Sequence, residues 1–328
     1  MGYHKIKDTR ILITGGAGFI GSNLCEDFLG SNNQVVCLDN FSTGKRENIE
    51  PFLKNRNFNL IEGDIRDPAV CREAMTGIDL VLQQAALGSV PRSLNDPQTT
   101  NEVNVTGFLN VLMAAKEAGV KRFVYAASSS TYGDSPLLPK TEESIGKPLS
   151  PYAVSKYTNE LYAHVFALNF GMTIVGLRYF NVYGRRQDPE GAYAAVIPKF
   201  IKQLMSHQSP RINGDGNTSR DFTYVDNVVQ MNHLAAVADV RSIAPVYNTA
   251  CGDRTDLNTL VRLLKRHLGR FDRAIGDIQA EYGPARPGDI AHSWASIEKA
   301  RADLGYSPTH DLDRGIAESV DWYWHNLK

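Results

Sequence analysis

The sequence predicts an α/β fold: a doubly wound parallel sheet followed by a smaller, mixed C-terminal domain. Two observations support this prediction. Over residues 1–178, short apolar runs alternate with segments of helical periodicity, which is typical of parallel strands joined by helical crossovers. Beyond residue 178, irregular stretches containing Gly, Pro and Arg separate short helical segments. We therefore expect domains at 1–178 and 179–328. We expect them to interleave, because Phe222–Val225 and Val246–Thr249 resemble strands that return to the main sheet.

The first predicted strand leads into a glycine-rich turn. Ile11–Ile13 is apolar throughout, as in a buried parallel strand, and an amphipathic helix follows the turn. Gly16, Gly18 and Gly21 match G-x-G-x-x-G, while Gly15, Gly18 and Gly21 match the related G-x-x-G-x-x-G. Glycine permits the tight turn and lets N–H groups at the helix N-terminus approach a pyrophosphate. The pattern predicts a Rossmann-type dinucleotide site that includes Gly15, Gly18, Phe19, Ile20 and Gly21.

The second predicted strand, Gln34–Leu38, favours NAD over NADP. It ends in Asp39, 18 residues after Gly21. An acidic side chain at this point accepts hydrogen bonds from the adenosine ribose and repels a 2′-phosphate. The alternative is that Asp39 is an ordinary residue at a strand end. We expect the polar loop Asn40–Asn48 to run over the cofactor, with Asn40 in contact with it.

The third predicted strand, Phe58–Gly63, brings two further residues to the same edge of the sheet. Asp64 and Ile65 follow it directly, and we expect them to lie over the adenine. An alternative role for Asp64 is to cap the helix that begins near Asp67.

The remaining elements continue the alternation of strands and helices. A fourth strand, Leu80–Leu82, is followed by small residues that let a ligand approach, and Gln84, Ala85 and Ala86 are predicted cofactor contacts. The other expected elements are a loop at Gly88–Ser93, a helix from about Thr99 to Ala118, a strand at Arg122–Ala127, a helix from Pro151 to about Asn169 and a strand at Thr173–Leu177.

Tyr152 and Lys156 are the main catalytic candidates, because they lie one helical turn apart on one face of a predicted helix. A phenol is a poor base at neutral pH. A neighbouring ammonium and the positive ring of NAD⁺ favour the phenolate and lower the pKa of the tyrosine. The phenolate then accepts a proton from an alcohol, and Ser128 can hydrogen-bond the same hydroxyl. Spacing alone carries no weight, since Tyr3 and Lys7 share it; the preceding dinucleotide pattern distinguishes Tyr152.

Composition and charge argue against several classes of partner. The chain has 328 residues, of which 42% are hydrophobic and 22% charged, and its formal net charge is −1. This balance gives no electrostatic basis for binding nucleic acid or an anionic membrane. No apolar run is long enough to span a bilayer, and the amino terminus lacks the apolar core of a signal peptide, so we expect a cytoplasmic protein. The four scattered cysteines predict reduced thiols, and no metal site is expected.

Several motifs together resemble the extended short-chain dehydrogenase/reductase family over nearly the whole chain. They are Thr14–Gly21, Asp39–Asn40, Gly63–Ile65, Ser128–Ser130, Tyr152-x-x-x-Lys156, Arg178–Asn181 and Ala285–Asp289. Three longer stretches resemble a bacterial subgroup of UDP-sugar 4-epimerases that act on N-acetylated sugars: Gln84–Ser93, Ala127–Asp134 and Tyr179–Gln187. The resemblance also implies a homodimer, in which the two long predicted helices pair across the interface as a four-helix bundle.

The resemblance implies interconversion of UDP-GlcNAc and UDP-GalNAc through a transient 4-keto sugar, with UDP-Glc and UDP-Gal as further candidate substrates. Ser128, Tyr152 and Lys156 would be catalytic, and NAD would stay bound through turnover. Asn104 and Tyr179 would support the lysine and the nicotinamide. The residues implied around the UDP-sugar are Gly88, Ser89, Ser128, Ser129, Ser130, Asn181, Gln187, Ala195, Arg220, Arg286, Asp289 and Ser293.

The resemblance assigns particular roles to four residues of the second domain. Arg220 and Arg286 would bind the diphosphate, because guanidinium groups match phosphate oxygens in geometry. Asp289 would lie near the uridine ribose. Ser293 would form the wall of the pocket that receives the substituent on carbon 2 of the sugar. A small residue there admits an acetamido group, whereas a tyrosine would exclude it.

Alternatives remain open at this point. Ser129 and Ser130 stand where related dehydratases and decarboxylases carry acidic residues, so those reactions lack their acid/base group here. A 4-epimerase of UDP-N-acetylglucosaminuronic acid would keep the same mechanism, with Arg92, Arg185 or Arg186 pairing with the uronate. A catalytically inactive, NAD-sensing binding protein is a more distant alternative, since such proteins usually lack the catalytic tyrosine or lysine.

Overall fold

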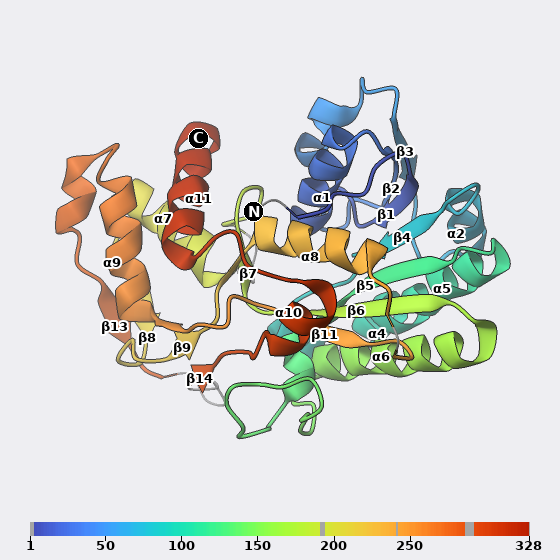
Figure 1. The fold of residues 1–328 in the computed structure, drawn as a ribbon. Helices are drawn as coiled ribbons and strands as arrows, with labels where there is room; N and C mark the ends of the chain where they lie inside the picture. The colour runs from blue at the N-terminus through green and yellow to red at the C-terminus, as the bar shows by residue number, and fades with distance from the viewer. Residues whose placement is uncertain (1–2, 191–193, 241, 286–291, 328) are drawn as a thin grey trace.

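Seven parallel strands form the central sheet in the computed structural model, which describes residues 3–190, 194–240, 242–285 and 292–327 (Figure 1). The strand order is β11-β6-β5-β4-β1-β2-β3. The strands are β1 (Arg10–Thr14), β2 (Gln34–Asp39), β3 (Phe58–Glu62), β4 (Leu80–Gln83), β5 (Arg122–Ser128), β6 (Thr173–Tyr179) and β11 (Val246–Thr249). The order reverses between β1 and β4, which is where ligands bind in doubly wound sheets. The predicted fold class is confirmed.

The two faces of the sheet belong to separate apolar cores. On β1, Ile11 and Ile13 pack in one core, and Leu12 packs in the other. The helices whose apolar residues join the first core are α1 (Phe19–Gly30), α8 (Val225–Val237) and α10 (Glu298–Leu304). Those joining the second are α2 (Pro68–Ala74), α5 (Phe108–Glu117) and α6 (Pro151–Phe170). In Figure 1, α8 and α6 lie on opposite sides of the sheet. Burial of both faces explains why the central strands read as continuous apolar runs.

Two expected elements differ in the structure. The helix expected from Thr99 to Ala118 is divided into α4 (Pro97–Asn101), a π-helical segment (Glu102–Gly107) and α5. Hydrophobic periodicity does not distinguish a π turn from an α turn, and π turns are frequent near functional sites. The loop expected at Gly88–Ser93 instead enters a short helix, α3 (Val90–Asn95). The Ser89 side chain starts this helix by accepting a hydrogen bond from the Arg92 N–H.

The described residues after β6 combine helices with three small sheets. Besides α8, the helices here are α7 (Val196–Met205), α9 (Leu257–Leu268), α10 (Glu298–Leu304) and α11 (Leu312–Asn326). The small sheets pair β7 (Val182–Tyr183) with β10 (Thr223–Tyr224), β8 (Arg211–Asn213) with β13 (Glu281–Gly283), and β9 (Ser219–Arg220) with both β12 (Thr255–Asp256) and β14 (His292–Ser293). Short 3-10 helices occur at Arg46–Asn48, Glu50–Phe52, Ser129–Tyr132 and Arg273–Asp277. Across the described residues, no helix is both long and apolar enough to cross a membrane.

The expectation that two later segments return to the main sheet is correct for one of them. Val246–Thr249 pairs with β6 as the terminal strand β11. Thr223–Tyr224 does not join that sheet and pairs with Val182–Tyr183 instead. The reason is local: Asp221 and Phe222 alone separate this strand from β9, so the chain remains with the small sheets until α8 carries it back.

A buried ion pair fixes α6 on the sheet. Arg178 of β6 donates two hydrogen bonds to the Glu160 carboxylate of α6, at 2.9 and 2.7 Å, and both side chains are buried. The carboxylate of Glu160 raises the pKa of Arg178 against the effect of burial. An unpaired charge in this place would be strongly unfavourable, so the pair commits α6 to one position. Because Glu160 follows Lys156 by one helical turn, the same contact positions the predicted catalytic face of the helix.

Candidate active site

A cavity of about 470 Å³ lies at the carboxyl ends of strands β1 to β6, beside the reversal of strand order. It collects nearly all of the predicted cofactor residues, although they are spread over most of the first domain. The predicted residues that line it are Gly15, Gly18, Phe19, Ile20, Gly21, Asp39, Asn40, Asp64, Ile65, Gln84, Ala85, Ala86, Tyr152, Lys156 and Tyr179. Asn104 is the predicted cofactor residue that does not line the cavity, and it lies behind the wall.

The glycine turn after β1 fits a pyrophosphate. Gly15 has a φ of +67°, and a Cβ there would lie 2.8 Å from the Cα of Ala85. A Cβ at Gly21 would lie 2.0 Å from the Gly15 carbonyl oxygen, so the helix packs on the turn without room for a side chain. Helix α1 begins after Gly18, which offers no side chain to cap it. The N–H groups of the first helical turn are thereby kept for an anion.

Asp39 lies at the end of β2 with its carboxylate buried against this turn. It accepts hydrogen bonds from the N–H groups of Ala17 (2.9 Å) and Phe41 (2.8 Å). Burial raises the pKa of Asp39, and these N–H groups lower it in part. A carboxylate can accept about four hydrogen bonds, so Asp39 keeps acceptor capacity for the hydroxyl groups of a ribose.

Asp64 takes part in a polar cluster after β3, the strand next to β2. It accepts a hydrogen bond from the Asn40 amide at 2.8 Å and pairs with Arg66 at 2.7 Å, which holds the pKa of Asp64 at about 2. The N-cap of α2 is Asp67, whose side chain accepts from Ala69 N–H, so the alternative role of Asp64 as this cap is wrong.

Ser128, Tyr152 and Lys156 meet where β5 faces the start of α6. The Ser150 side chain caps α6 by accepting from Ala153 N–H at 3.1 Å, which fixes the first turn that carries Tyr152. Ser128 and Tyr152 both line the cavity, and the Ser128 hydroxyl lies close enough to lower the pKa of Tyr152 in part. Lys156 is buried, and its Nζ donates a hydrogen bond to the carbonyl of Ala126 in β5 at 2.9 Å.

Burial has the largest effect on the pKa values of Tyr152 and Lys156. It lowers the pKa of Lys156 to about 8 and raises the pKa of Tyr152, which the Ser128 hydroxyl lowers in part. The sequence predicted a lowered pKa for Tyr152, and the protein alone does not provide it. The physical reason is that the phenol is desolvated while the lysine amine is directed at a backbone carbonyl. A lowered value requires the additional positive charge that NAD⁺ carries.

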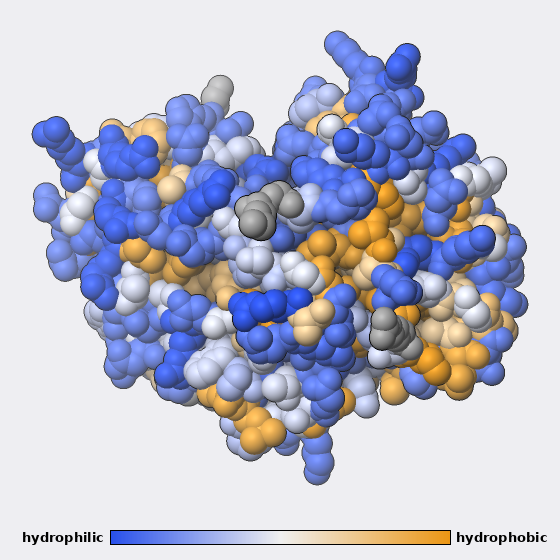
Figure 2. All heavy atoms as spheres, viewed as in Figure 1, coloured by the Kyte–Doolittle hydropathy of each residue, from blue (hydrophilic) through white to orange (hydrophobic). Residues whose placement is uncertain are grey.

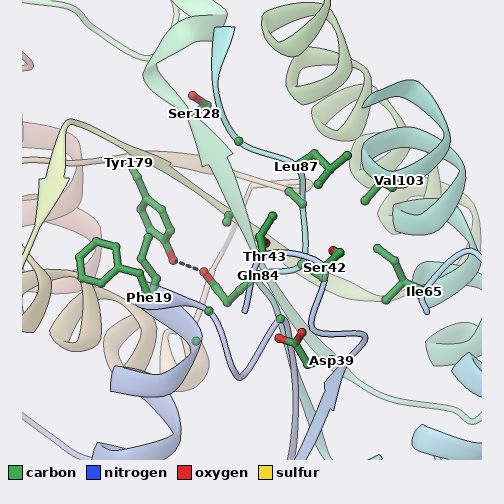
Figure 3. Close-up of a pocket in the computed structure, with 18 of the residues that line it drawn as sticks. Phe19, Asp39, Ser42, Thr43, Ile65, Gln84, Leu87, Val103, Ser128 and Tyr179 are labelled. Carbon is green, nitrogen blue, oxygen red and sulfur yellow. Dashed lines mark hydrogen bonds between the residues drawn. The ribbon is translucent and has the colours of Figure 1, made fainter. Parts of the chain in front are cut away.

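A ring of three hydrogen bonds closes the inner end of the cavity. Tyr179 donates to the Gln84 side-chain oxygen at 3.1 Å, Asn232 of α8 donates to the Tyr179 hydroxyl at 2.9 Å, and Gln84 donates to Asn232 at 3.4 Å. Figure 3 shows Tyr179 and Gln84 pointing toward each other, with Phe19 beside them. The ring holds the side chain of Tyr179 in one orientation toward the cavity. Asn232 was not predicted, since nothing in the local sequence links α8 to this site.

Asn104 supports the site from behind. It lies in the π-helical segment, accepts from the Leu87 N–H at 2.7 Å, and donates to the Leu87 carbonyl and the Ser155 hydroxyl, both at 3.1 Å. Asn104 therefore joins the loop after β4 to the residue that precedes Lys156. This geometry is compatible with its predicted role as a support of the lysine. Asn104 does not line the cavity, and direct contact with the cofactor stays a prediction.

The predicted substrate residues fall into three groups. Gly88, Ser128, Ser129 and Asn181 line the cavity. Arg286 and Asp289 lie outside the described residues. The remaining predicted substrate residues lie outside the lining of the cavity: Ser89, Ser130, Gln187, Ala195, Arg220 and Ser293.

Several residues in that last group have other contacts. Ser89, with a φ of +94°, caps α3, and the Ser130 hydroxyl donates to Ser128 at 2.9 Å. Gln187 donates to the Val182 carbonyl, and its side-chain oxygen is buried with no hydrogen-bond partner. Ala195 is exposed at the start of α7.

Arg220 and Ser293 lie side by side although 73 positions separate them in the sequence. They are register partners in the parallel pairing of β9 with β14. Arg220 also donates to the Ser219 carbonyl at 2.9 Å. The structure therefore brings the predicted diphosphate arginine and the predicted wall of the sugar pocket into one small sheet.

Some residues of the cavity were not predicted individually. Ser42 and Thr43 come from the polar loop that was expected over the cofactor, and Figure 3 shows them beside the cavity. Leu87 and Val103 supply apolar wall opposite Asp39. Leu87 lies in the loop after β4 and Val103 in the π-helical segment. Their sequence context carries no signal, because an apolar residue in either place usually indicates the core.

Asp226, His310 and Glu318 bring possible metal ligands within 4.8 Å of one another, away from the cavity. Arg185 pairs with Asp226 at 2.7 Å and Arg314 pairs with Glu318 at 3.1 Å. These arginines already neutralise the carboxylates, so the geometry gives no support for a cation here.

The fold and this site define a class of protein. A parallel sheet with a glycine turn after β1, together with a Ser–Tyr–Lys group between β5 and α6, is the arrangement of an NAD-dependent enzyme of the short-chain dehydrogenase type. The profile of the NAD dependent epimerase/dehydratase family matches residues 11–250. The chain belongs to this family.

Individual relatives agree with this membership. UDP-glucose 4-epimerase of Mycolicibacterium smegmatis is 33% identical over 326 residues, covering 96% of this chain and 98% of the relative. The structure of UDP-N-acetylglucosamine 4-epimerase from Methanobrevibacter ruminantium, in complex with UDP-N-acetylmuramic acid, is 37% identical. It has a TM-score of 0.90 and covers 98% of this chain and 100% of its own. UDP-glucuronic acid 4-epimerase from Bacillus cereus, in complex with UDP-glucuronic acid and NAD, is 32% identical. It has a TM-score of 0.86, and the match covers 96% of this chain and 99% of its own. The predictions of an epimerase and of NAD as its cofactor are confirmed.

We expect the purified protein to carry NAD without supplementation, and Gly18→Val to lose most of it. A Cβ at Gly18 meets little protein apart from the Gly15 carbonyl at 3.2 Å, so larger side chains extend toward the anion site. Nucleotide released on denaturation and quantified by chromatography measures the content. Gly30→Ala, at the other end of α1 where a Cβ meets nothing within 4 Å, is the matched control. Equal NAD content in both variants would contradict this assignment of the turn.

Tyr152→Phe is expected to keep the fold and bound NAD but to lose turnover by at least about 100-fold, since proton transfer contributes roughly that much or more. The loss of one buried hydroxyl changes stability by only about 1 kcal/mol. Steady-state kinetics, with circular dichroism and NAD content measured in parallel, test this. Tyr157→Phe, on the same helix and outside the cavity lining, should retain activity. Wild-type turnover in Tyr152→Phe would remove this residue from the mechanism.

Proposed function

We propose that the protein is a UDP-sugar 4-epimerase that interconverts UDP-GlcNAc and UDP-GalNAc, and that also accepts UDP-Glc and UDP-Gal. The observation that carries the choice of substrate is the small residue Ser293 in register with Arg220. If Arg220 binds the diphosphate, the sugar begins next to Ser293, whose side chain leaves space for an acetamido group. The similarity to a UDP-N-acetylglucosamine 4-epimerase supports the same choice.

The proposed mechanism uses the residues at the start of α6. Tyr152 accepts the proton of the 4-hydroxyl and later returns it, while Ser128 orients the same hydroxyl by hydrogen bonding. Lys156, whose pKa burial lowers to about 8, keeps most of its positive charge at neutral pH and favours the phenolate. NAD⁺, held by the glycine turn and Asp39, supplies the hydride acceptor. The intermediate 4-keto sugar would present its other face, and the hydride would return to carbon 4 as Tyr152 returns the proton to the oxygen.

The positions of the carboxylates support epimerisation over dehydration. Among the described residues that line the cavity, the carboxylates are Asp39 and Asp64, and both lie at the end assigned to adenosine. At the catalytic end, Ser129 lines the cavity and Ser130 donates to Ser128. Elimination at carbon 6 requires a group that protonates the leaving oxygen, and serine is a very weak acid.

Two of the three arginines that could bind a uronate are already paired with carboxylates of the protein. Arg185 pairs with Asp226 at 2.7 Å and with Glu26 at 3.4 Å, and Arg186 pairs with Glu26 at 2.9 Å. These contacts tie the segment after β7 to α1 and α8. Arg92 remains as the arginine nearest in sequence to the predicted sugar contacts. Similarity to a UDP-glucuronic acid 4-epimerase keeps this alternative in the test below.

Product analysis tests the substrate directly. The holoenzyme is incubated separately with UDP-GlcNAc, UDP-Glc, UDP-GlcA and UDP-N-acetylglucosaminuronic acid, and the 4-epimers are separated by chromatography. We expect conversion of the neutral sugars, with no added NAD. Turnover confined to the uronic acids would overturn the proposal in favour of the alternative.

Ser293→Tyr is expected to lower kcat/KM for UDP-GlcNAc by roughly 5- to 150-fold, because overpacking costs about 1–3 kcal/mol. UDP-Glc has no acetyl group to clash and should change much less. Parallel kinetics with both substrates measure the difference, and Ser293→Ala is the control that keeps the side chain small. If the tyrosine variant retained the wild-type preference for the acetylated sugar, Ser293 would not form the wall of the pocket.

We also propose that the protein is a homodimer that pairs through α5 and α6. Helix α6 carries a stripe of exposed apolar side chains at helical spacing: Val154, Leu161, Val165 and Leu168, each 49–57% exposed. Figure 2 shows hydrophobic residues gathered at the lower right, where Figure 1 places α6. Such a stripe is typical of a helix that packs against a partner.

The double variant Leu161→Glu, Leu168→Glu is expected to be monomeric, because it places charges in the centre of the proposed interface. Light scattering coupled to size-exclusion chromatography gives the mass of each species. Leu137→Glu, at a similarly exposed apolar residue of a loop, should leave the mass unchanged. A wild-type protein that is monomeric at micromolar concentration would contradict the proposal.

A further inference from the structure

Asp221 is a fully buried carboxylate outside the cofactor cavity, in the two-residue connection between β9 and β10. Its two oxygens accept three backbone hydrogen bonds, from Cys251 N–H at 2.9 Å, Gly252 N–H at 3.1 Å and Ala295 N–H at 3.3 Å. Two segments that are distant in the sequence, the turn after β11 and the segment after β14, are therefore joined to the β9–β10 connection by one side chain.

The backbone of Asp221 extends the same junction toward the predicted substrate residues. Its N–H donates to the Ser293 carbonyl at 2.9 Å, and its carbonyl accepts from the Asn181 side chain at 3.0 Å. The preceding residue is Arg220. Asp221 is thus bonded to, or adjacent to, three residues predicted to bind the UDP-sugar, and these residues come from three different parts of the chain.

Asn181 shows why such support is needed. Its φ is +33°, a conformation that residues other than glycine rarely adopt, so its backbone is strained. The hydrogen bond to the Asp221 carbonyl holds its side chain in place at the wall of the cavity. A second contact, from Thr223 N–H to the Asn181 carbonyl at 3.4 Å, joins the same two chain segments.

We propose that Asp221 is the positioning residue of the UDP-sugar half of the site: it fixes Arg220, Asn181 and Ser293 relative to one another and thereby sets the affinity for UDP-sugars, without contacting NAD. The inference rests on the proposed substrate roles of these three residues. It adds a residue to which the family motifs assigned no part, and it separates substrate affinity from the cofactor site.

A carboxylate is required because of the number of donors. Three N–H groups donate to the two oxygens of Asp221. A side-chain amide has one acceptor oxygen, so it cannot accept hydrogen bonds at both positions. Burial raises the pKa of Asp221 to about 7, while the three N–H groups lower it in part. A carboxyl group is retained here at a cost in desolvation, which argues that its geometry is used.

Asp221→Asn tests the proposal. The amide nitrogen must replace one acceptor oxygen, so at least one backbone N–H loses its partner and the junction loosens. We expect the dissociation constant of UDP, measured by calorimetry, to rise about tenfold, with KM for UDP-sugars rising in parallel. Bound NAD should stay at the wild-type level, and kcat should change by less than about threefold, since Tyr152 and Lys156 are untouched.

Asp253→Asn is the matched control. Asp253 lies in the same turn as Gly252 but is exposed, and its side chain accepts only from the neighbouring Arg254 N–H among the bonds described. The control should bind UDP as the wild type does. Wild-type UDP affinity in folded Asp221→Asn would overturn the proposal. So would equal losses of NAD, kcat and thermal stability with unchanged KM, which is the result expected if Asp221 only stabilises the fold.

A measurement on the wild-type holoenzyme covers the case in which Asp221→Asn does not fold. If the junction sets the affinity for UDP, then UDP must stabilise the junction by the same free energy. Hydrogen–deuterium exchange should therefore slow in peptides containing Cys251, Gly252 and Ala295 when UDP is added. Unchanged exchange in these peptides at saturating UDP would overturn the proposal.

The outcome is distinguishable from a failure of the proposed function. UDP lacks the sugar, so its affinity does not depend on which sugar is epimerised. An enzyme that binds UDP through this junction but converts only uronic acids would refute the choice of substrate and leave the role of Asp221 intact.

Discussion

The buried pair between Arg178 and Glu160 is the contact on which the geometry of the site depends. It joins β6 to α6, and the same guanidinium also donates to the Glu142 carbonyl at 2.9 Å and lies over the Tyr132 ring. Tyr132 in turn donates to Asn248 of β11, whose amide donates to the Ser296 carbonyl. One charged group therefore links the helix that carries Tyr152 to the segment that follows Ser293. Because a charge at this depth tolerates few arrangements, the two halves of the site are held in a fixed relation.

Each half of the site is built around a buried aspartate that collects backbone N–H groups. Asp39 binds the N–H groups of the glycine turn and of the residue after Asn40, whereas Asp221 binds three N–H groups from the second part of the chain. Both carboxylates have a raised pKa because burial outweighs these hydrogen bonds. Asp39 also lines the cavity, while Asp221 acts through the residues bonded to it. The same arrangement would serve direct contact with the cofactor in one half and, as proposed, positioning of the substrate residues in the other.

The sequence predicted the parts of the site that depend on local patterns. The glycine turn, Asp39 and Tyr152 each lie within or directly after an element whose periodicity can be read in a short window. Parallel strands bring such residues to one edge by topology alone. The π-helical turn at Asn104 was missed because its hydrophobic pattern matches that of an α-helix. Asp221 and Asn232 were missed because their partners lie 30 to 148 residues away, a relation that no local pattern contains. The burial that raises the pKa of Tyr152 in the protein alone was missed for a related reason, since burial depends on the whole fold.

Under the proposed roles of Arg220 and Ser293, the register between β9 and β14 determines how substrate affinity and sugar selectivity are related. Ser293 and Arg220 are partners in that register, and both are joined to the backbone of Asp221 or adjacent to it. If Arg220 and Ser293 have the roles proposed for them, a change in the junction displaces the diphosphate contact and the sugar wall together, and it weakens the binding of all UDP-sugars alike. A change confined to the Ser293 side chain leaves the backbone register in place and affects only the sugars whose substituents reach it. Uniform binding and selectivity are therefore separable in this site, because the first depends on main-chain contacts and the second on the volume of one side chain.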